Sequence, residues 1–165
     1  AMRGKDEFTW RRMSKRHLAN NMYLPSMENE TIGEIIVAID TSGSIGSHEI
    51  TEFATELASI CEVVCPERVR VLWWDTKVHG EQIFDGQYND IAKLLKPLGG
   101  GGTQARCVNE YINQEKLMAE CVLMFTDGYL ESDLRWMIPC PTLWMITRNR
   151  NFEAPVGKSV FFDNE

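Results

Sequence analysis

The apolar run Ile35–Ile39 passes directly into a small polar segment, Asp40–Ser44. A continuous apolar run of this length is typical of a parallel strand that is buried on both faces. From Ser47 to Val64, apolar residues recur at steps of three and four, and Pro66 follows. This spacing predicts an amphipathic helix that Ser47 caps. The segment therefore predicts a buried strand, a polar loop and a helix, in that order.

The alternation of strands and helices continues along the chain. Apolar runs predict strands at 69–74, 82–84, 121–125, 143–146 and 160–162, and amphipathic segments predict helices near 91–95, 105–112 and 134–137. This order predicts an α/β fold: a doubly wound, mainly parallel, Rossmann-like sheet with helices on both faces. Ligands of such sheets bind beyond the carboxyl ends of the strands, where the strand order reverses.

The chain of 165 residues, 44% of them hydrophobic, is long enough for one domain with its own core. Residues 1–30 show no sustained apolar period, so we expect an N-terminal arm or linker there and one domain over 31–165. No apolar run approaches the ~20 residues that cross a bilayer, and no apolar segment typical of a secretory signal follows the N-terminal charges. We therefore expect a soluble protein without a membrane partner.

The net charge of -7 is unevenly distributed. Residues 1–20 hold six Lys and Arg against two acidic residues, which gives this arm +4 and leaves -11 for the remainder. An acidic body argues against nucleic acid as the main partner, because binding to phosphates needs positive charge. We interpret the basic arm as a linker or as a docking strip for another acidic surface.

The cysteines form no paired CxxC sets, and several fall within predicted helices or strands. Free thiols in a reducing cytoplasm are therefore favoured over disulfides or a zinc site. The five positions are Cys61, Cys65, Cys107, Cys121 and Cys140.

Side chains that carry oxygen follow three separate segments of the predicted sheet. Asp40, Ser42 and Ser44 follow the first strand, Thr103 follows a run of four glycines, and Asp127 follows a later strand. Two carboxylates and three hydroxyls form a hard donor set that suits Mg2+, with Mn2+ and Ca2+ as alternatives, whereas zinc would recruit His or Cys. The glycines allow close approach of the backbone. The sequence therefore predicts one divalent-cation site.

These motifs resemble a known family. Asp-Thr-Ser-Gly-Ser after an apolar strand, a distant Gly-Gly-Thr and Phe-Thr-Asp-Gly are similar to the metal ion-dependent adhesion site of von Willebrand factor A domains, over residues 33–163. The resemblance implies that Ser42, Ser44 and Thr103 contact the metal through their hydroxyls, and that Asp40 and Asp127 bind directly or through water. It also implies an interaction module in which an Asp or Glu of a partner protein completes the coordination, in the cytoplasm beside an AAA+ ATPase or within a multidomain assembly.

The segment from Trp10 to Ser26, with the strand and loop that follow, is similar to bacterial and phage proteins in which a predicted zincin-type metallopeptidase domain precedes a von Willebrand A-like domain. This resemblance implies a regulatory or substrate-recognition domain of a longer protein. The chain itself has no HExxH motif, because His48-Glu49 is followed by Ile50-Thr51-Glu52. We expect no peptidase activity from it.

Enzymatic alternatives remain. The glycine run could hold a nucleotide phosphate, although the lysine of a P-loop is missing. A metal-dependent hydrolase or phosphotransferase could use Asp40, although haloacid dehalogenase-like phosphatases carry a second Asp where this chain has Ser42. We expect His48 and His79 to be solvated surface residues rather than bases, and Asp75, at the end of a strand, to reach the rim of the site. No catalytic residue is predicted.

Overall fold

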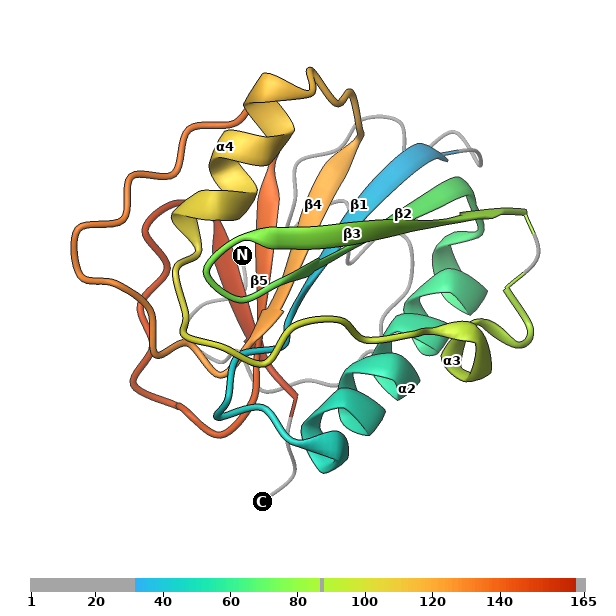
Figure 1. Cartoon of the computed structure of the whole chain (residues 1–165). Helices are drawn as coiled ribbons and strands as arrows, with labels where there is room; N and C mark the ends of the chain where they lie inside the picture. Colours follow the sequence, from blue (N-terminus) through green and yellow to red (C-terminus); the bar gives the residue numbers. More distant parts are fainter. Residues whose placement is uncertain (1–31, 87, 163–165) are drawn as a thin grey trace.

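The computed structural model describes residues 32–86 and 88–162, and these form a six-stranded sheet with helices on both sides (Figure 1). The strand order is β3-β2-β1-β4-β5-β6. Neighbouring strands are parallel except β3, which runs antiparallel to β2 at one edge. The elements are β1 Ile32–Asp40, α2 Ser47–Val64, β2 Pro66–Trp74, β3 Val78–Asp85, α3 Ile91–Leu94, α4 Arg106–Gln114, β4 Cys121–Thr126, β5 Thr142–Ile146 and β6 Lys158–Phe161. The predicted α/β fold is confirmed, while the predicted arm at 1–30 lies outside the described residues.

Helices bury both faces of the central strand β1. Val37 belongs to the hydrophobic cluster that holds Phe53 of α2 and Ile91 of α3. The next residue, Ala38, belongs to the cluster that holds Val108 of α4. Since successive side chains of a strand point to opposite faces, α2 and α3 cover one face of the sheet and α4 covers the other (Figure 1). The apolar run of β1 is continuous because both of its faces are buried.

The start of α2 differs from the prediction. Gly46, rather than Ser47, is the N-cap, and its backbone N–H donates to Glu49 Oε1 at 2.9 Å. The carboxylate of Glu49 therefore satisfies the N–H of the N-cap residue, while Gly46 has no side chain to cap the first turn. The helix ends at Val64, and Cys65 adopts a left-handed conformation with φ of 50° before β2 begins.

The predicted helix at 134–137 is wrong, because this segment is irregular. Its side chains are held by the rest of the fold: the buried Trp136 donates its indole N–H to Thr142 Oγ1 at 2.7 Å, and the backbone N–H of Met137 donates to Asn109 Oδ1 at 2.7 Å. Pro139 follows, and proline disfavours helix in the residue before it. Tertiary contacts have therefore overridden a weak local pattern.

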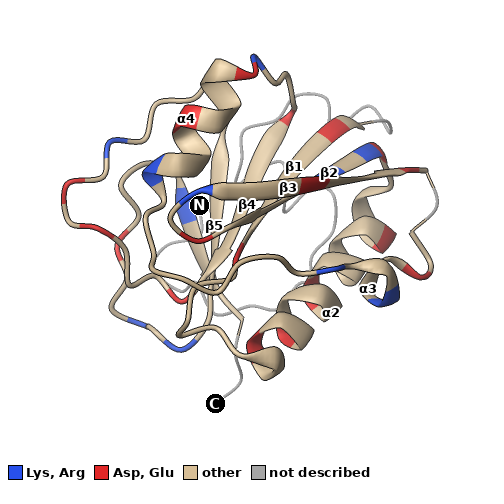
Figure 2. Ribbon diagram, viewed as in Figure 1, with Lys and Arg blue, Asp and Glu red and all other residues tan. Residues whose placement is uncertain are grey.

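Acidic residues are spread over the helices, the strands and the connecting loops, and Lys and Arg residues lie among them (Figure 2). No helix in the described part of the chain combines the length and the apolar character that a membrane span needs.

Candidate metal site

Three loops meet at the carboxyl end of the central strands. The chain enters the first from β1 and the second from β4, which is the neighbour of β1 in the sheet. From β1 the sheet grows toward β2 on one side and toward β4 on the other, so the strand order reverses between β1 and β4. The third loop, residues 99–104, leads into α4. The polar residues predicted from the sequence therefore lie at the place where doubly wound sheets bind ligands.

Asp40 is fully buried at the end of β1. Its Oδ1 accepts from the backbone N–H of Ser42 at 2.8 Å, and its Oδ2 accepts from Thr126 Oγ1 at 2.7 Å. Burial raises the pKa of Asp40 above its ordinary value and repulsion from Asp127 adds to the rise, although the hydrogen bonds from Ser42 and Thr126 oppose it. Asp40 is thus a buried carboxylate fixed in orientation at both oxygens.

Hydrogen bonds join four of the five predicted residues into one cluster. Ser42 Oγ lies 3.3 Å from Ser44 Oγ, and Ser44 Oγ donates to Asp127 Oδ2 at 2.9 Å. The other oxygen of Asp127 accepts from the backbone N–H of Tyr129 at 3.3 Å. The loops after β1 and β4 therefore present their hydroxyl and carboxylate oxygens toward one point.

Thr103 belongs to the glycine loop, residues 99–104, which is bonded to the loop after β1. The backbone N–H of Gly43 donates to the carbonyl of Gly101 at 2.8 Å, which ties the glycine loop to the loop after β1. Thr103 follows two residues later and is half-buried. Among the described residues, no hydrogen bond connects its hydroxyl to the cluster. The fold therefore brings Thr103 to the rim, while the other four residues are linked directly.

Asp75, at the end of β2, holds the glycine loop in place. Its Oδ2 accepts from the backbone N–H groups of Gly100 at 3.1 Å and Gly101 at 2.9 Å. Its Oδ1 lies 2.7 Å from His79 Nε2 and also accepts from the backbone N–H groups of Thr76 and Lys77. The prediction that Asp75 reaches the rim is confirmed. His79 is exposed, as predicted, and its ring is in addition bonded to this carboxylate.

The donor set of the cluster fits a hard divalent cation, since every donor is a carboxylate or hydroxyl oxygen. Within the described residues, no three or more His, Cys, Asp and Glu side chains form a group that could hold a metal. The candidate site therefore depends on its three hydroxyls as much as on its two carboxylates.

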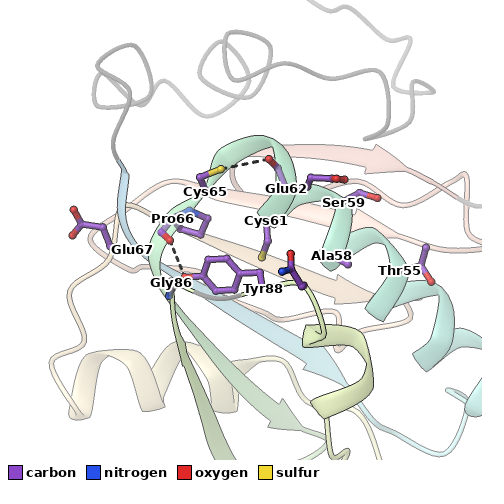
Figure 3. Close-up of a pocket in the computed structure, with 11 residues that line it drawn as sticks. Thr55, Ala58, Ser59, Cys61, Glu62, Cys65, Pro66, Glu67, Gly86 and Tyr88 are labelled. Carbon is purple, nitrogen blue, oxygen red and sulfur yellow. Dashed lines mark hydrogen bonds between the residues drawn. The ribbon is translucent and has the colours of Figure 1, made fainter.

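A separate hollow of about 700 Å³ lies at the other end of α2 (Figure 3). Cys61 and Tyr88 line it, and the hydroxyl of Tyr88 donates to the carbonyl of Pro66 at 2.8 Å. Burial raises the pKa of the Cys61 thiol to about 12. A raised pKa disfavours the thiolate, which is the form in which a cysteine acts as a nucleophile.

Comparisons with known proteins agree with the fold. A family model described as "VWA-like domain (DUF2201)" matches residues 35–163. An uncharacterized protein of Thermotoga maritima is 29% identical to this chain over 109 residues. That match covers 66% of this chain and 26% of the relative, so the chain spans about a quarter of the relative's length. All five residues of the candidate metal site fall inside the region that the family model matches.

Proposed function

Because this chain belongs to the family of VWA-like domains, a class of interaction or regulatory modules, we propose that it binds a partner protein through a divalent cation. The preferred ion is Mg2+, with Mn2+ and Ca2+ as alternatives. The hydroxyls of Ser42, Ser44 and Thr103 hold the ion, and Asp40 and Asp127 bind it directly or through water. The observation that carries this proposal is the hydrogen-bonded oxygen cluster formed by loops after two adjacent strands.

The composition of the cluster leaves room for a partner ligand. Mg2+ prefers about six oxygen ligands, so five protein side chains leave at least one position for an external oxygen. Three of these side chains are neutral hydroxyls, which means that the bound ion keeps part of its charge toward a new anion. An Asp or Glu of the partner is therefore the expected ligand, and residues around the site supply the specificity.

We propose a non-enzymatic role for this domain. A metal-dependent hydrolase needs a further acid or base beside the metal. Of the two histidines that the structure describes, His79 lies beside Gly99 of the glycine loop, and its Nε2 is 2.7 Å from Asp75 Oδ1. His48 has a side chain that is 73% exposed and contacts Glu52 on the same helix. We expect no hydrolysis of p-nitrophenyl phosphate with Mg2+ or Mn2+; turnover that Asp40→Ala abolishes would favour the hydrolase instead.

The partner can belong to the same polypeptide or to another one. Since the chain spans about a quarter of its Thermotoga relative, a neighbouring domain in a longer protein is one candidate, and an upstream metallopeptidase-like domain is the form we propose. An AAA+ ATPase is the candidate in trans, in a cytoplasmic setting. Sequencing the flanking reading frame for an HExxH motif separates the two.

The metal site is tested by calorimetry and thermal melting with Mg2+, Mn2+ and Ca2+. We expect saturable binding by the native chain, and stabilisation of about 2.7 kcal/mol when Mg2+ is present at one hundred times its dissociation constant. Thr103→Ala and Asp40→Ala remove one ligand each and should lose both the binding and the stabilisation.

Thr103→Ala is the sharper of these two variants, because Thr103 makes no hydrogen bond to the cluster among the described residues and its loss should leave the metal-free fold intact. Asp40 also accepts hydrogen bonds from Ser42 and Thr126, so its replacement disturbs the loop as well. Equal Mg2+ stabilisation of native protein and Thr103→Ala would contradict the proposed ligand set.

A further inference from the structure

A groove of about 530 Å³ lies directly beside the loop that follows β1. Ser42 and Gly43 of the candidate metal loop form one end of it. Its apolar lining comes from Ile45 and Ile50 on the side of α2 and from Pro97 and Leu98 on the side of the glycine loop. Every side chain that lines the groove is uncharged. The groove is therefore suited to an apolar group next to the metal rather than to a second charge.

Hydrogen bonds fix the groove relative to the metal loop. Thr41 Oγ1 donates to the carbonyl of Leu98, and the two oxygens are 2.6 Å apart. The backbone N–H of Gly43 donates to the carbonyl of Gly101 at 2.8 Å. These bonds attach the wall formed by Pro97 and Leu98 to the loop that carries Ser42 and Ser44, and the wall formed by Ile45 and Ile50 follows that loop directly in the chain. The spacing between the groove and the candidate metal site is therefore set before a partner arrives. A preformed site of this kind lowers the entropy cost of binding.

Leu98 leaves apolar surface available for a ligand. This residue is 47% exposed, whereas Ile45, which also lines the groove, is 8% exposed. An aliphatic side chain placed between them would remove apolar surface of Leu98 from water. The hollow on the other flank of the site, about 490 Å³, differs because it is lined by Glu131 and Glu153. Glu131 is paired with Arg106, so Glu153 is the carboxylate in this hollow that would repel an acidic partner segment.

We propose that this groove receives an aliphatic side chain from the same partner segment whose carboxylate binds the cation. The partner motif is then an Asp or Glu with a Leu, Ile, Val or Met within about three residues, since an extended chain advances ~3.3 Å per residue. This inference rests on the proposed function. The metal selects only a carboxylate, and the groove adds a second requirement, an aliphatic side chain close to that carboxylate.

The test uses a displayed library of random peptides that share one fixed Asp, selected against this chain in Mg2+ and in EDTA. The expected result is Mg2+-dependent enrichment of aliphatic residues at one position near the Asp. For a selected peptide, replacing that residue with Ala should weaken binding about tenfold. This comparison between peptides uses the native chain, so it does not depend on how any variant folds.

Two leucines of similar exposure provide matched variants. Leu98 lines the groove, and Leu94, which is 50% exposed, does not. Leu98→Ser should abolish the tenfold difference between the aliphatic peptide and its Ala version, and Leu94→Ser should keep it. Mg2+-dependent binding without an aliphatic preference, or a preference that survives Leu98→Ser, overturns the inference and leaves the metal-dependent function standing. A library that yields no Mg2+-dependent binder overturns the proposed function and this inference with it.

Discussion

Asp75→Ala is expected to lower the free energy of unfolding by about 3 kcal/mol, because several donors that Asp75 satisfies would lose their acceptor. Asp75 is 4% exposed and accepts from backbone N–H groups in two loops, among them those of Gly100 and Gly101. Urea denaturation followed by circular dichroism measures the change. The glycine loop also carries Thr103, so calorimetry should show weaker Mg2+ binding in the same variant.

His79→Ala is the matched control for this prediction. It removes the imidazole bonded to Asp75 Oδ1 and leaves the backbone hydrogen bonds to Asp75 in place. We therefore expect a loss of about 1 kcal/mol. If Asp75→Ala cost no more than His79→Ala, the carboxylate would not be the group that holds the loop.

Acid titration provides a second check on Asp75. Burial acts to raise the pKa of Asp75, but the hydrogen bonds from Gly101, His79, Lys77 and Thr76 outweigh it, and the net pKa lies below the ordinary range. A carboxylate with a lowered pKa contributes stability that is complete above its unfolded pKa of ~3.9 and is lost as the pH falls through the folded pKa. The difference in unfolding free energy between native protein and Asp75→Ala should therefore shrink below about pH 4, and a difference that grew there would contradict the assignment.

The fold was predictable because its strongest signals are long and local. The apolar run Ile35–Ile39 could be recognised without knowing its neighbours, since a strand buried on both faces has no polar side to show. The same holds for the spacing of apolar residues from Ser47 to Val64, which fits one face of a helix. Two acidic loops then had to meet, because parallel neighbouring strands end at the same edge of the sheet.

Features that depend on contacts distant in sequence were harder to predict. His79 and Asp75 are close in sequence, but the carboxylate of Asp75 also accepts from the backbone N–H of Gly100, 25 residues later. The sequence alone does not show this second bond, which holds the glycine loop. The segment 134–137 shows the same limitation, because Trp136 is positioned by Thr142 and by packing against Trp144 rather than by helical spacing. The spacing of four residues between Asp75, at the end of a strand, and His79 was the sequence signal that could have indicated their hydrogen bond.

Asp127→Asn is expected to separate metal binding from folding. The amide keeps one oxygen that can accept from Ser44 Oγ, but it leaves the backbone N–H of Tyr129 without its acceptor and removes one of the two negative charges. Mg2+ affinity should therefore fall at least ~100-fold. In the absence of metal the stability of the variant should lie within about 1 kcal/mol of that of the native chain, because relief of the repulsion between Asp127 and the buried Asp40 offsets the loss of the bond from Tyr129. Melting curves with and without Mg2+ measure both effects.

Asp85→Asn is the control, since Asp85 ends β3 beside Arg68 at the opposite end of the sheet and should leave the Mg2+ response unchanged. The change in stability of Asp127→Asn without metal, together with its response to Mg2+, tests whether Asp127 serves folding or metal binding. A turn residue that served folding alone would lose stability when it lost its charge, and Mg2+ would act on native protein and variant alike. The proposed cation site predicts a different result: removing one of two carboxylates that repel each other should cost little stability without metal, and it should abolish the response to Mg2+.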